Sequence, residues 1–376
     1  HDANALVQIG DEPSVSADTR LIEEGMTVEA QNVFGSLEHD RAQMLDKFGK
    51  FMPVGFYYKA FFRPKGAWKL WEPIIRRMAG LGKVNTDAHH GYFDKQYLWA
   101  DVCVVGGGPA GSTVAALVAE AGHNVQLFER ENFPRFSIGE SLMPDTYWTF
   151  KRLGVLDKLK ASAFPRKHSV QFFGKSGRGS APFYFSDNNP HESSVTWQVQ
   201  RGKFDLMLLD NARDKGAEIH QGARVLEVLF DGDRAIGVRA KLADGQSQDF
   251  TAPIIVDATG QSALIGRKLK ITEPEAQLNK ASIYTHYSGG RRDEGKDEGA
   301  TLILHTDNGD SWFWYIPLPD DIVSVGVVGA IDYLVQGRKE DAQTIFEQEL
   351  AKGAPMQERL QHAEQLMPAK TTKDFS

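Results

Sequence analysis

The alternation of apolar and polar positions changes character between residues 101 and 130. DVCVV is a short apolar run rich in β-branched residues, GGGPAG follows it, and STVAALVAEAG has the composition of a helix packed with small residues. HNVQLFER then predicts a second strand that ends at Glu129. The stretch therefore predicts a strand, a glycine-rich turn, a helix and a second strand in succession.

Beyond residue 140 the pattern mixes helical and strand-like runs. Helices are predicted over 141–161, over FDLMLLDNARDKG and, as two charged amphipathic segments, over 338–363. Because strands and helices do not simply alternate, we expect an α/β fold in which a Rossmann-type nucleotide domain is interleaved with a mixed β-sheet substrate domain, the latter at about 165–200 and 280–335. The predicted strands are HSVQFF, APFYF, VTWQVQ, ARVLEVLFD, RAIGVRAKL, PIIVDATG, ASIYTHYS, ATLILHT, SWFWYIP and DIVSVGVVG.

Residues 1–100 show no clear sheet pattern. They are rich in aromatic and basic residues, and they predict one or two helices with irregular connections. We therefore expect a boundary near residue 100, between a first segment that need not form a stable domain and a second region over 101–376.

Composition narrows the class of protein. The 376 residues are 41% hydrophobic and 25% charged, which is typical of a globular protein of two or three domains. The net charge of −7 argues against a nucleic-acid partner. The single cysteine, Cys103, excludes a disulfide framework and a multi-thiolate metal site, and we predict no metal. With no signal peptide and no apolar run of about 18 residues, the sequence favours a cytoplasmic protein without a membrane partner.

The glycine-rich turn has the spacing of a dinucleotide-binding fingerprint. Gly106 allows the tight turn, Gly108 lets a pyrophosphate approach the backbone, and Gly111 lets helix and strand pack closely. The intervening Pro109 and Ala110 begin the helix, whose N-terminus offers free N–H groups and the positive end of its dipole to phosphates.

Further residues complete the predicted nucleotide site. Glu129, at the end of the second strand, would accept hydrogen bonds from a ribose hydroxyl pair, and Arg130 follows it. The strand PIIVDATG adds a second glycine turn with Asp257 and Gly260. Two-motif flavoproteins of the hydroxylase type use such a strand, whereas nicotinamide dehydrogenases with one fingerprint usually lack it, so we predict FAD. Arg201, at a helix start, either contacts the cofactor or is a solvated arginine.

NFPRFSIGESLMP, residues 132–144, follows the ribose-binding acid directly. Taken alone, its Gly-Glu-Ser could be an ordinary helix N-terminus. In this position we expect Ile138, Gly139, Glu140 and Ser141 to lie beside the flavin.

WFWYIP, residues 312–317, is the second distinctive stretch. Together with GGGPAG it resembles the flavin-dependent halogenases, the tryptophan-halogenase-like FAD-dependent oxidoreductases, which carry GxGxxG near their start and WxWxIP in mid-chain. The resemblance covers about residues 100–376. It implies that Trp312, Trp314 and Ile316 line a passage between flavin and substrate, while Phe313 and Tyr315 face the other side and are structural.

The resemblance also implies a reaction. In that family, reduced FAD, oxygen and halide give hypohalous acid, which reaches a lysine beside an electron-rich aromatic ring such as a phenol or pyrrole. By position the lysine is Lys167 of FPRKHSVQFF; a solvated basic surface is the alternative, and Lys175 is the weaker candidate. No second fingerprint for a nicotinamide is present, so a separate flavin reductase is expected to supply reduced FAD. The substrate would be free or bound to a carrier protein.

Two departures from the family leave other functions open. TTKDFS resembles the lead-in to a third flavin motif, so we expect that motif to lie outside this sequence. MPVGFYYKAFFRP and WEPIIRRMAGLG, within residues 1–100, resemble the α subunit of sarcosine oxidases. The alternatives are a related FAD-dependent monooxygenase or prenyl reductase, an amine-oxidising subunit, and an inactive FAD-binding fragment. GESLMP and WFWYIP favour the halogenase.

Overall fold

The computed structural model describes residues 6–10, 12–16, 21–30, 39, 68–78, 98–273, 275 and 278–373. The chain divides into two compact units, residues 1–95 and residues 96–376. This division falls close to residue 100, where the sequence pattern changes. Among the described residues, no helix is both long and apolar enough to cross a membrane.

The first unit contains strands that the sequence pattern did not predict. They form a small antiparallel sheet in the order β2-β1-β3, and one helix, α2 (Trp68–Met78), follows. The strands are three to five residues long and β3 is exposed throughout, so no alternation of burial marks them in the sequence. Most of the aromatic and basic stretch lies outside the described residues. The strands are β1 (Leu6–Ile9), β2 (Glu12–Ser16) and β3 (Val28–Ala30).

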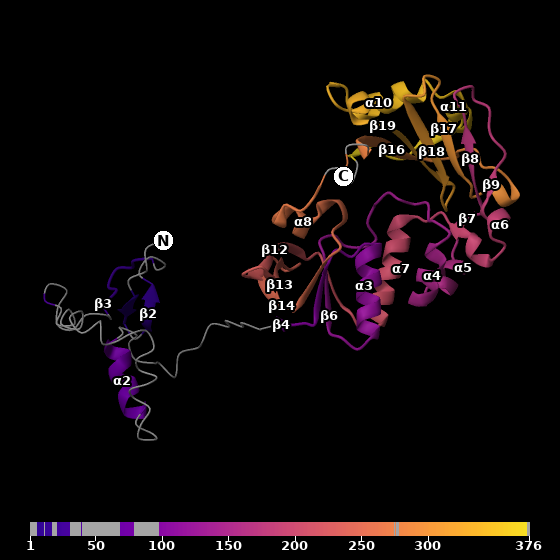
Figure 1. Cartoon of the computed structure of the whole chain (residues 1–376). Helices are drawn as coiled ribbons and strands as arrows, with labels where there is room; N and C mark the ends of the chain where they lie inside the picture. Colours follow the sequence, from indigo (N-terminus) through magenta and orange to yellow (C-terminus); the bar gives the residue numbers. More distant parts are fainter. Residues whose placement is uncertain are drawn as a thin grey trace. The chain divides into compact units, whose positions relative to one another are not determined.

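A four-stranded parallel sheet forms the centre of the nucleotide domain, in the order β11-β6-β5-β15. Strands β5 and β6 are buried along their whole length. β5 is entirely apolar, as expected of a strand covered on both faces, whereas β6 also carries the buried polar residues Gln126 and Glu129. Helices α3 and α7 lie side by side against this sheet (Figure 1). The elements are β5 (Val102–Val105), α3 (Pro109–Glu120), β6 (Val125–Glu129), α7 (Arg201–Asp214), β11 (Glu218–Gln221) and β15 (Ile254–Asp257).

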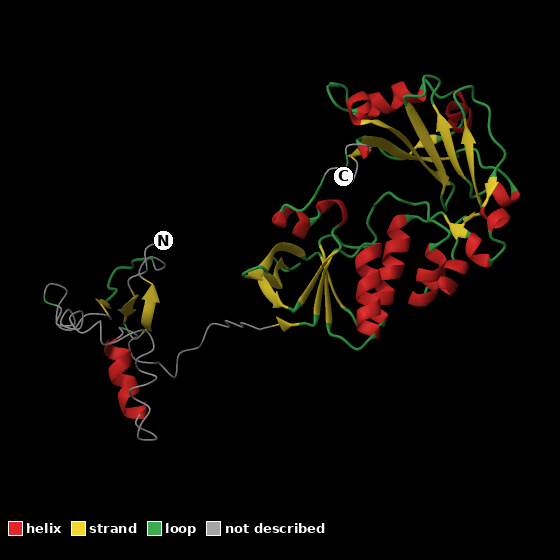
Figure 2. Ribbon diagram, in the orientation of Figure 1, coloured by secondary structure: helices red, strands yellow, loops and turns green. Residues whose placement is uncertain are grey.

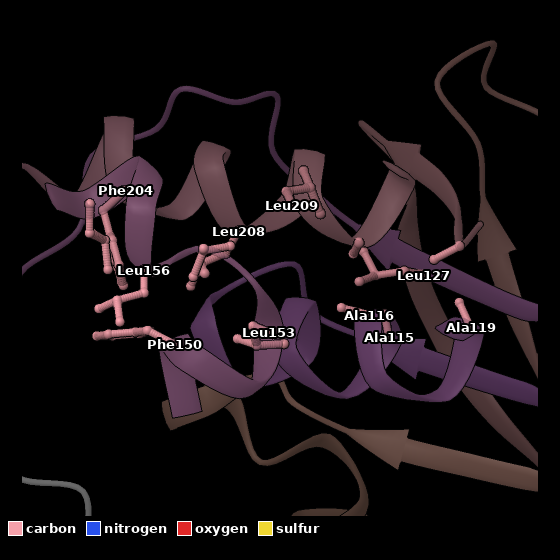
Figure 3. Packing of buried hydrophobic residues seen from close by; sticks show 14 of the residues in the cluster. Ala115, Ala116, Ala119, Leu127, Phe150, Leu153, Leu156, Phe204, Leu208 and Leu209 are labelled. Carbon is pink, nitrogen blue, oxygen red and sulfur yellow. The ribbon is translucent and has the colours of Figure 1, made fainter. Parts of the chain in front are cut away.

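Small residues let the two helices approach closely. Figure 3 shows Ala115, Ala116 and Ala119 of α3 in one buried cluster with Leu208 and Leu209 of α7. A second cluster joins the parallel sheet to another sheet of order β12-β13-β14-β4. These strands are β4 (Leu98–Trp99), β12 (Arg224–Asp231), β13 (Arg234–Lys241) and β14 (Ser247–Thr251).

Cys103 belongs to this second cluster. Its side chain is fully buried, and burial raises the pKa of the thiol to about 12. The cysteine is therefore an inert core residue at neutral pH.

A larger mixed sheet forms the second domain, in the order β20-β16-β19-β18-β17-β8-β9, with β21 also paired to β16. Helices α10 (Ala342–Leu350) and α11 (Ala354–Leu360) cover one face of it (Figures 1 and 2). The strands are β8 (Ser169–Phe173), β9 (Phe183–Tyr184), β16 (Lys280–Ser288), β17 (Thr301–His305), β18 (Ser311–Pro317), β19 (Ile322–Ala330), β20 (Glu364–Gln365) and β21 (Lys370–Lys373).

Two local predictions are corrected by the structure. The helix expected over 141–161 is two helices, α4 (Thr146–Leu153) and α5 (Leu156–Lys160), separated at Gly154 with φ +76°. The predicted helix does not begin at residue 141, because Ser141 forms an isolated β-bridge with Gln198 and a turn precedes α4. The strand expected at VTWQVQ is two residues long and pairs outside the large sheet, as β10 (Thr196–Trp197) with β7 (Arg166–Lys167).

The remaining elements are short helices between these layers. They are α6 (Phe185–Asn188), α8 (Leu264–Leu269), α9 (Ile331–Leu334) and the 3₁₀ turns η3 (Glu192–Ser194), η4 (Gly260–Ser262) and η6 (Gly295–Asp297).

Candidate active site

The glycine turn between β5 and α3 is packed too tightly for a larger residue at Gly106 or Gly111. A Cβ on Gly111 would lie 1.8 Å from the Gly106 carbonyl oxygen, and one on Gly106, at φ +103°, would lie 2.4 Å from the Ala258 oxygen. The second glycine turn thus abuts the first. At Gly108 the nearest atom to a Cβ is the Nη2 of Arg135, at 3.4 Å, so the N-terminus of α3 stays open beside a guanidinium. A pyrophosphate fits such a cradle.

Glu129 lies at the end of β6, as the sequence predicts, and is buried. Its Oε2 accepts a hydrogen bond from the Gly107 N–H at 2.7 Å, and its Oε1 accepts one from the Glu131 N–H at 2.9 Å. The carboxylate is therefore fixed at the edge of the glycine turn with lone pairs left for ribose hydroxyls. This donor and acceptor set fits an adenine dinucleotide.

Arg135 is a candidate site residue that the sequence analysis missed. It stands within the FPR of residues 132–144, and its guanidinium lies 3.4 Å from Asp205 and 4.0 Å from Glu129. The motif was visible in the sequence, but the approach of Arg135 to Gly108 depends on the fold of the loop. A cation here complements the negative charge of a pyrophosphate.

Arg201 begins α7 and is not a solvated arginine. Its side chain is 14% exposed and forms a bidentate ion pair with Asp205, at 2.7 and 3.0 Å. Its Nη1 also donates to the Ile138 carbonyl, and a Cβ on Gly139 (φ +92°) would lie 3.0 Å from that nitrogen. Arg201 thus fastens the 138–139 turn to α7. Its contact with the cofactor stays a prediction.

Three other predicted cofactor residues lie in contacts or turns within their own segments of the chain. Arg130 is exposed and pairs with Glu131 at 3.6 Å. The carboxylate of Asp257 accepts hydrogen bonds from the backbone N–H groups of Thr259 and Ile265, and so orders the turn that contains Gly260 (φ +60°). The cofactor contacts of Arg130, Asp257 and Gly260 stay predictions.

Lys167 is buried on β7 with 4% of its surface exposed, so it is not a solvated lysine. Its Nζ donates to the Ser141 Oγ at 2.9 Å and to the Leu142 carbonyl at 3.2 Å, and lies 5.4 Å from the centre of the Phe185 ring. Burial lowers the pKa of the amine to about 8. By contrast, Lys175 is exposed in a turn.

Ser141 belongs to a polar network around the lysine. Its Oγ lies 2.9 Å from the Thr301 Oγ1, which in turn accepts a hydrogen bond from the Gln198 amide at 2.8 Å. Ser141 was predicted to bind the cofactor, but its described hydroxyl contacts are with Lys167 and Thr301. Thr301 and Gln198 were not predicted, because they join Ser141 only through the tertiary fold.

The residues of SWFWYIP divide between the two faces of β18. Phe313 and Tyr315 are fully buried in the cluster beneath α10 and α11. Trp312 and Trp314 point to the opposite face and are half-buried, and Ile316, on the same face, is buried. The alternation of faces thus agrees with the sequence pattern. A role for Trp312, Trp314 and Ile316 as a passage wall stays a prediction.

Trp314 is linked to Glu140 of the GES segment by hydrogen bonds. Its Nε1 donates to the Ser324 Oγ at 3.2 Å, and Ser324 donates to the Glu140 Oε2 at 3.0 Å. The other oxygen of Glu140 lies 2.8 Å from the His286 Nε2. Adjacent residues of one segment therefore lie near the two features of interest: Glu140 is linked to Trp314 through Ser324, and Ser141 contacts Lys167 directly.

Comparison with known proteins identifies the family of the chain. The family model described as FAD binding domain matches residues 99–352. A 1H-pyrrole-2-carbonyl-[peptidyl-carrier protein] chlorinase of Pseudomonas fluorescens is 33% identical over 248 residues, which are 61% of this chain and 55% of that protein. A corresponding brominase of Pseudoalteromonas luteoviolacea is 31% identical over 279 residues, 73% of this chain and 66% of that protein.

The structural comparison points the same way. The myxobacterial chondrochloren halogenase, a FAD-dependent enzyme, superposes with a TM-score of 0.68 at 33% identity, covering 74% of this chain and 64% of that one. The chain thus spans about half to two thirds of the length of these relatives. The resemblance of residues 1–100 to sarcosine oxidase stays a prediction, since the match to the family model begins at residue 99. The α/β fold, FAD as the cofactor and the resemblance to halogenases are confirmed, and the chain belongs to the FAD binding domain family, among the relatives of the flavin-dependent halogenases.

Proposed function

We propose that this protein is a flavin-dependent halogenase acting on an electron-rich aromatic substrate. The observation that carries the proposal is a buried lysine amine, Lys167, which donates to Ser141, while the neighbouring Glu140 is linked through Ser324 to the Trp314 of WxWxIP. The likeness to pyrrole-carrier halogenases supports a phenolic or pyrrolic ring, free or attached to a carrier protein. A separate reductase would supply the reduced flavin.

The residues of the chain would divide the work between binding and delivery. The glycine turn, Glu129 and Arg135 would hold the dinucleotide, and bound reduced FAD would supply, with oxygen, the oxidising power that converts halide to hypohalous acid. Lys167 would deliver the halogen from its Nζ, as a haloamine or by hydrogen bonding. Its lowered pKa increases the fraction of nucleophilic neutral amine near neutral pH. Trp314 would keep the aromatic substrate away from the flavin.

The test is an assay of the purified protein with reduced FAD, oxygen, chloride or bromide, and a panel of phenols and pyrroles. We expect halogenated products, detected by mass spectrometry, that form only when reduced FAD, oxygen and halide are all present. Hydroxylated products without halogenated ones would contradict the proposal and favour a monooxygenase. An absence of bound or bindable FAD would favour an inactive fragment.

Replacing Ser141 by alanine should separate positioning of the lysine from binding of the flavin. The change removes a hydrogen-bond acceptor of the Lys167 amine, and a hydrogen bond to a charged group is worth about 1.5–3 kcal/mol. We therefore expect kcat for halogenation to fall about tenfold or more, while the Kd for FAD is unchanged. The matched control is Ser169→Ala, a buried serine whose hydroxyl donates to Asp297 instead. If Ser141→Ala binds FAD more weakly and Ser169→Ala does not, Ser141 contacts the cofactor rather than only positioning the lysine.

A further inference from the structure

A cavity lies on the face of the large sheet that is covered by α10 and α11. It has a volume of about 530 Å³ and is bounded by β8, the 175–177 turn, β17 and α11. The guanidinium of Arg359, which lines it, lies 5.5 Å from the ring of Tyr315 and 5.7 Å from that of Phe173. Because Tyr315 and Trp314 point to opposite faces of β18, this cavity is separate from the Lys167 site.

The lining of the cavity is basic in a chain that is acidic overall. Four cationic side chains face two carboxylates there, whereas the chain carries a net charge of −7. Three of the cations have carboxylate partners among the described residues: Arg291 with Glu358 at 2.6 Å, Lys352 with Glu349 at 2.6 Å and Arg359 with Asp293 at 3.0 Å. The fourth, Lys175, donates to the Asn308 carbonyl at 3.1 Å.

Arg359 has a donor without an acceptor. The residue is 8% exposed, and its Nη2 is used by the ion pair with Asp293. Its Nη1 is buried and has no hydrogen-bond partner among the described residues. A buried donor left unpaired is unfavourable, and more so on a charged group, so an acceptor supplied by a ligand would stabilise this arrangement.

We propose that this cavity binds a small organic anion, through an oxoanion group that accepts hydrogen bonds from Arg359 and Lys175. The planar fork of arginine suits both carboxylate and phosphate oxygens. The ring of Phe173 and the side chain of Pro355 provide apolar surface for the rest of such a ligand. The volume is within the range of about 300–1,000 Å³ typical of small-molecule sites. This inference does not depend on the proposed halogenase activity.

The experiment measures binding of two probes, inorganic phosphate and benzoate, to the full chain by titration calorimetry at constant ionic strength in sodium chloride. We expect at least one probe to bind with a Kd of about 1 mM or tighter. If only phosphate binds, the ligand of the cavity is a phosphate ester; if only benzoate binds, the ligand is a carboxylate. If neither binds, the proposal is wrong.

Variants then place the bound probe in the cavity. Arg359→Met should abolish binding, and its fold is checked by circular dichroism because the residue is buried. Lys175→Met alters an exposed side chain, so it should leave the fold intact and weaken binding about fivefold or more. The matched control is Lys241→Met, an exposed lysine on β13 outside the cavity, which should bind as the unmodified chain does. Equal affinity in Lys175→Met and Lys241→Met would overturn the proposal.

Discussion

Replacing Lys167 by methionine is expected to abolish halogenation while leaving the oxidation of reduced FAD by oxygen unchanged. Methionine keeps most of the buried volume but has no amine, so the halogen can no longer be delivered at this position. Groups of this kind typically contribute about 10²–10⁴-fold to the rate. The measurement is the ratio of halogenated product formed to reduced flavin consumed, under saturating halide.

The control for this change is Lys175→Met, which removes the exposed lysine of the neighbouring turn. That variant should retain halogenation, because Lys175 contacts neither Ser141 nor Leu142 among the described interactions. Halogenation at the unmodified rate in Lys167→Met would remove the lysine from the mechanism. Loss of halogenation in Lys167→Met, with the unmodified rate kept in Lys175→Met, would support the role of Lys167.

The pKa of Lys167 gives a second measurement that does not require turnover. Burial lowers the pKa of this amine from 10.5 to about 8, so the folded state binds fewer protons than the unfolded state between these two values. The free energy of unfolding should therefore rise with pH over this window, by up to about 3 kcal/mol from this group. In Lys167→Met this contribution disappears. The difference in the free energy of unfolding between the variant and the unmodified chain should therefore change with pH between about 8 and 10.5. Parallel pH curves would show that the amine is not desolvated.

Much of the nucleotide site could be predicted because its residues are close in sequence. The glycine turn, the helix after it and Glu129 all lie within residues 101–130, and local spacing is sufficient to relate them. The two faces of β18 were likewise predictable, because side chains alternate along a strand whatever it packs against.

The contacts around the lysine could not be predicted in this way. Thr301 reaches Ser141 across 160 positions of sequence, and Ser324 reaches Glu140 across 184. Arg135 was missed for a related reason, since its approach to Gly108 depends on the loop and on Asp205 of α7. The N-terminal strands were missed because they are short and their described side chains show no alternation of burial.

Gly326→Ala is expected to have the second large effect, because Gly326 makes room for Trp314. The two residues are directly paired across β18 and β19, and a Cβ on Gly326 would lie 2.2 Å from the Cζ2 of the indole. The ring would have to move, at a cost of about 1–3 kcal/mol in the free energy of unfolding. Its hydrogen bond to Ser324 would be lost with it, and the fraction of hydroxylated or uncoupled product should rise. Chemical denaturation and product analysis measure the two effects.

Control variants decide whether the effect acts through the tryptophan. Gly329→Ala lies on the same strand, where the nearest atom to a Cβ is the Cδ1 of Tyr333 at 3.3 Å, so its stability should change little. In a Trp314→Leu background the clash is absent, and Gly326→Ala should then cost almost nothing, giving a coupling energy of about 1 kcal/mol or more. If the two changes are additive, the glycine does not hold the indole in place. The two changes could instead prove coupled while Gly326→Ala still gives only halogenated product. That result would keep the conclusion that Gly326 makes room for the indole, but it would show that Trp314 does not separate substrate from flavin, because the ring would have moved without exposing the substrate.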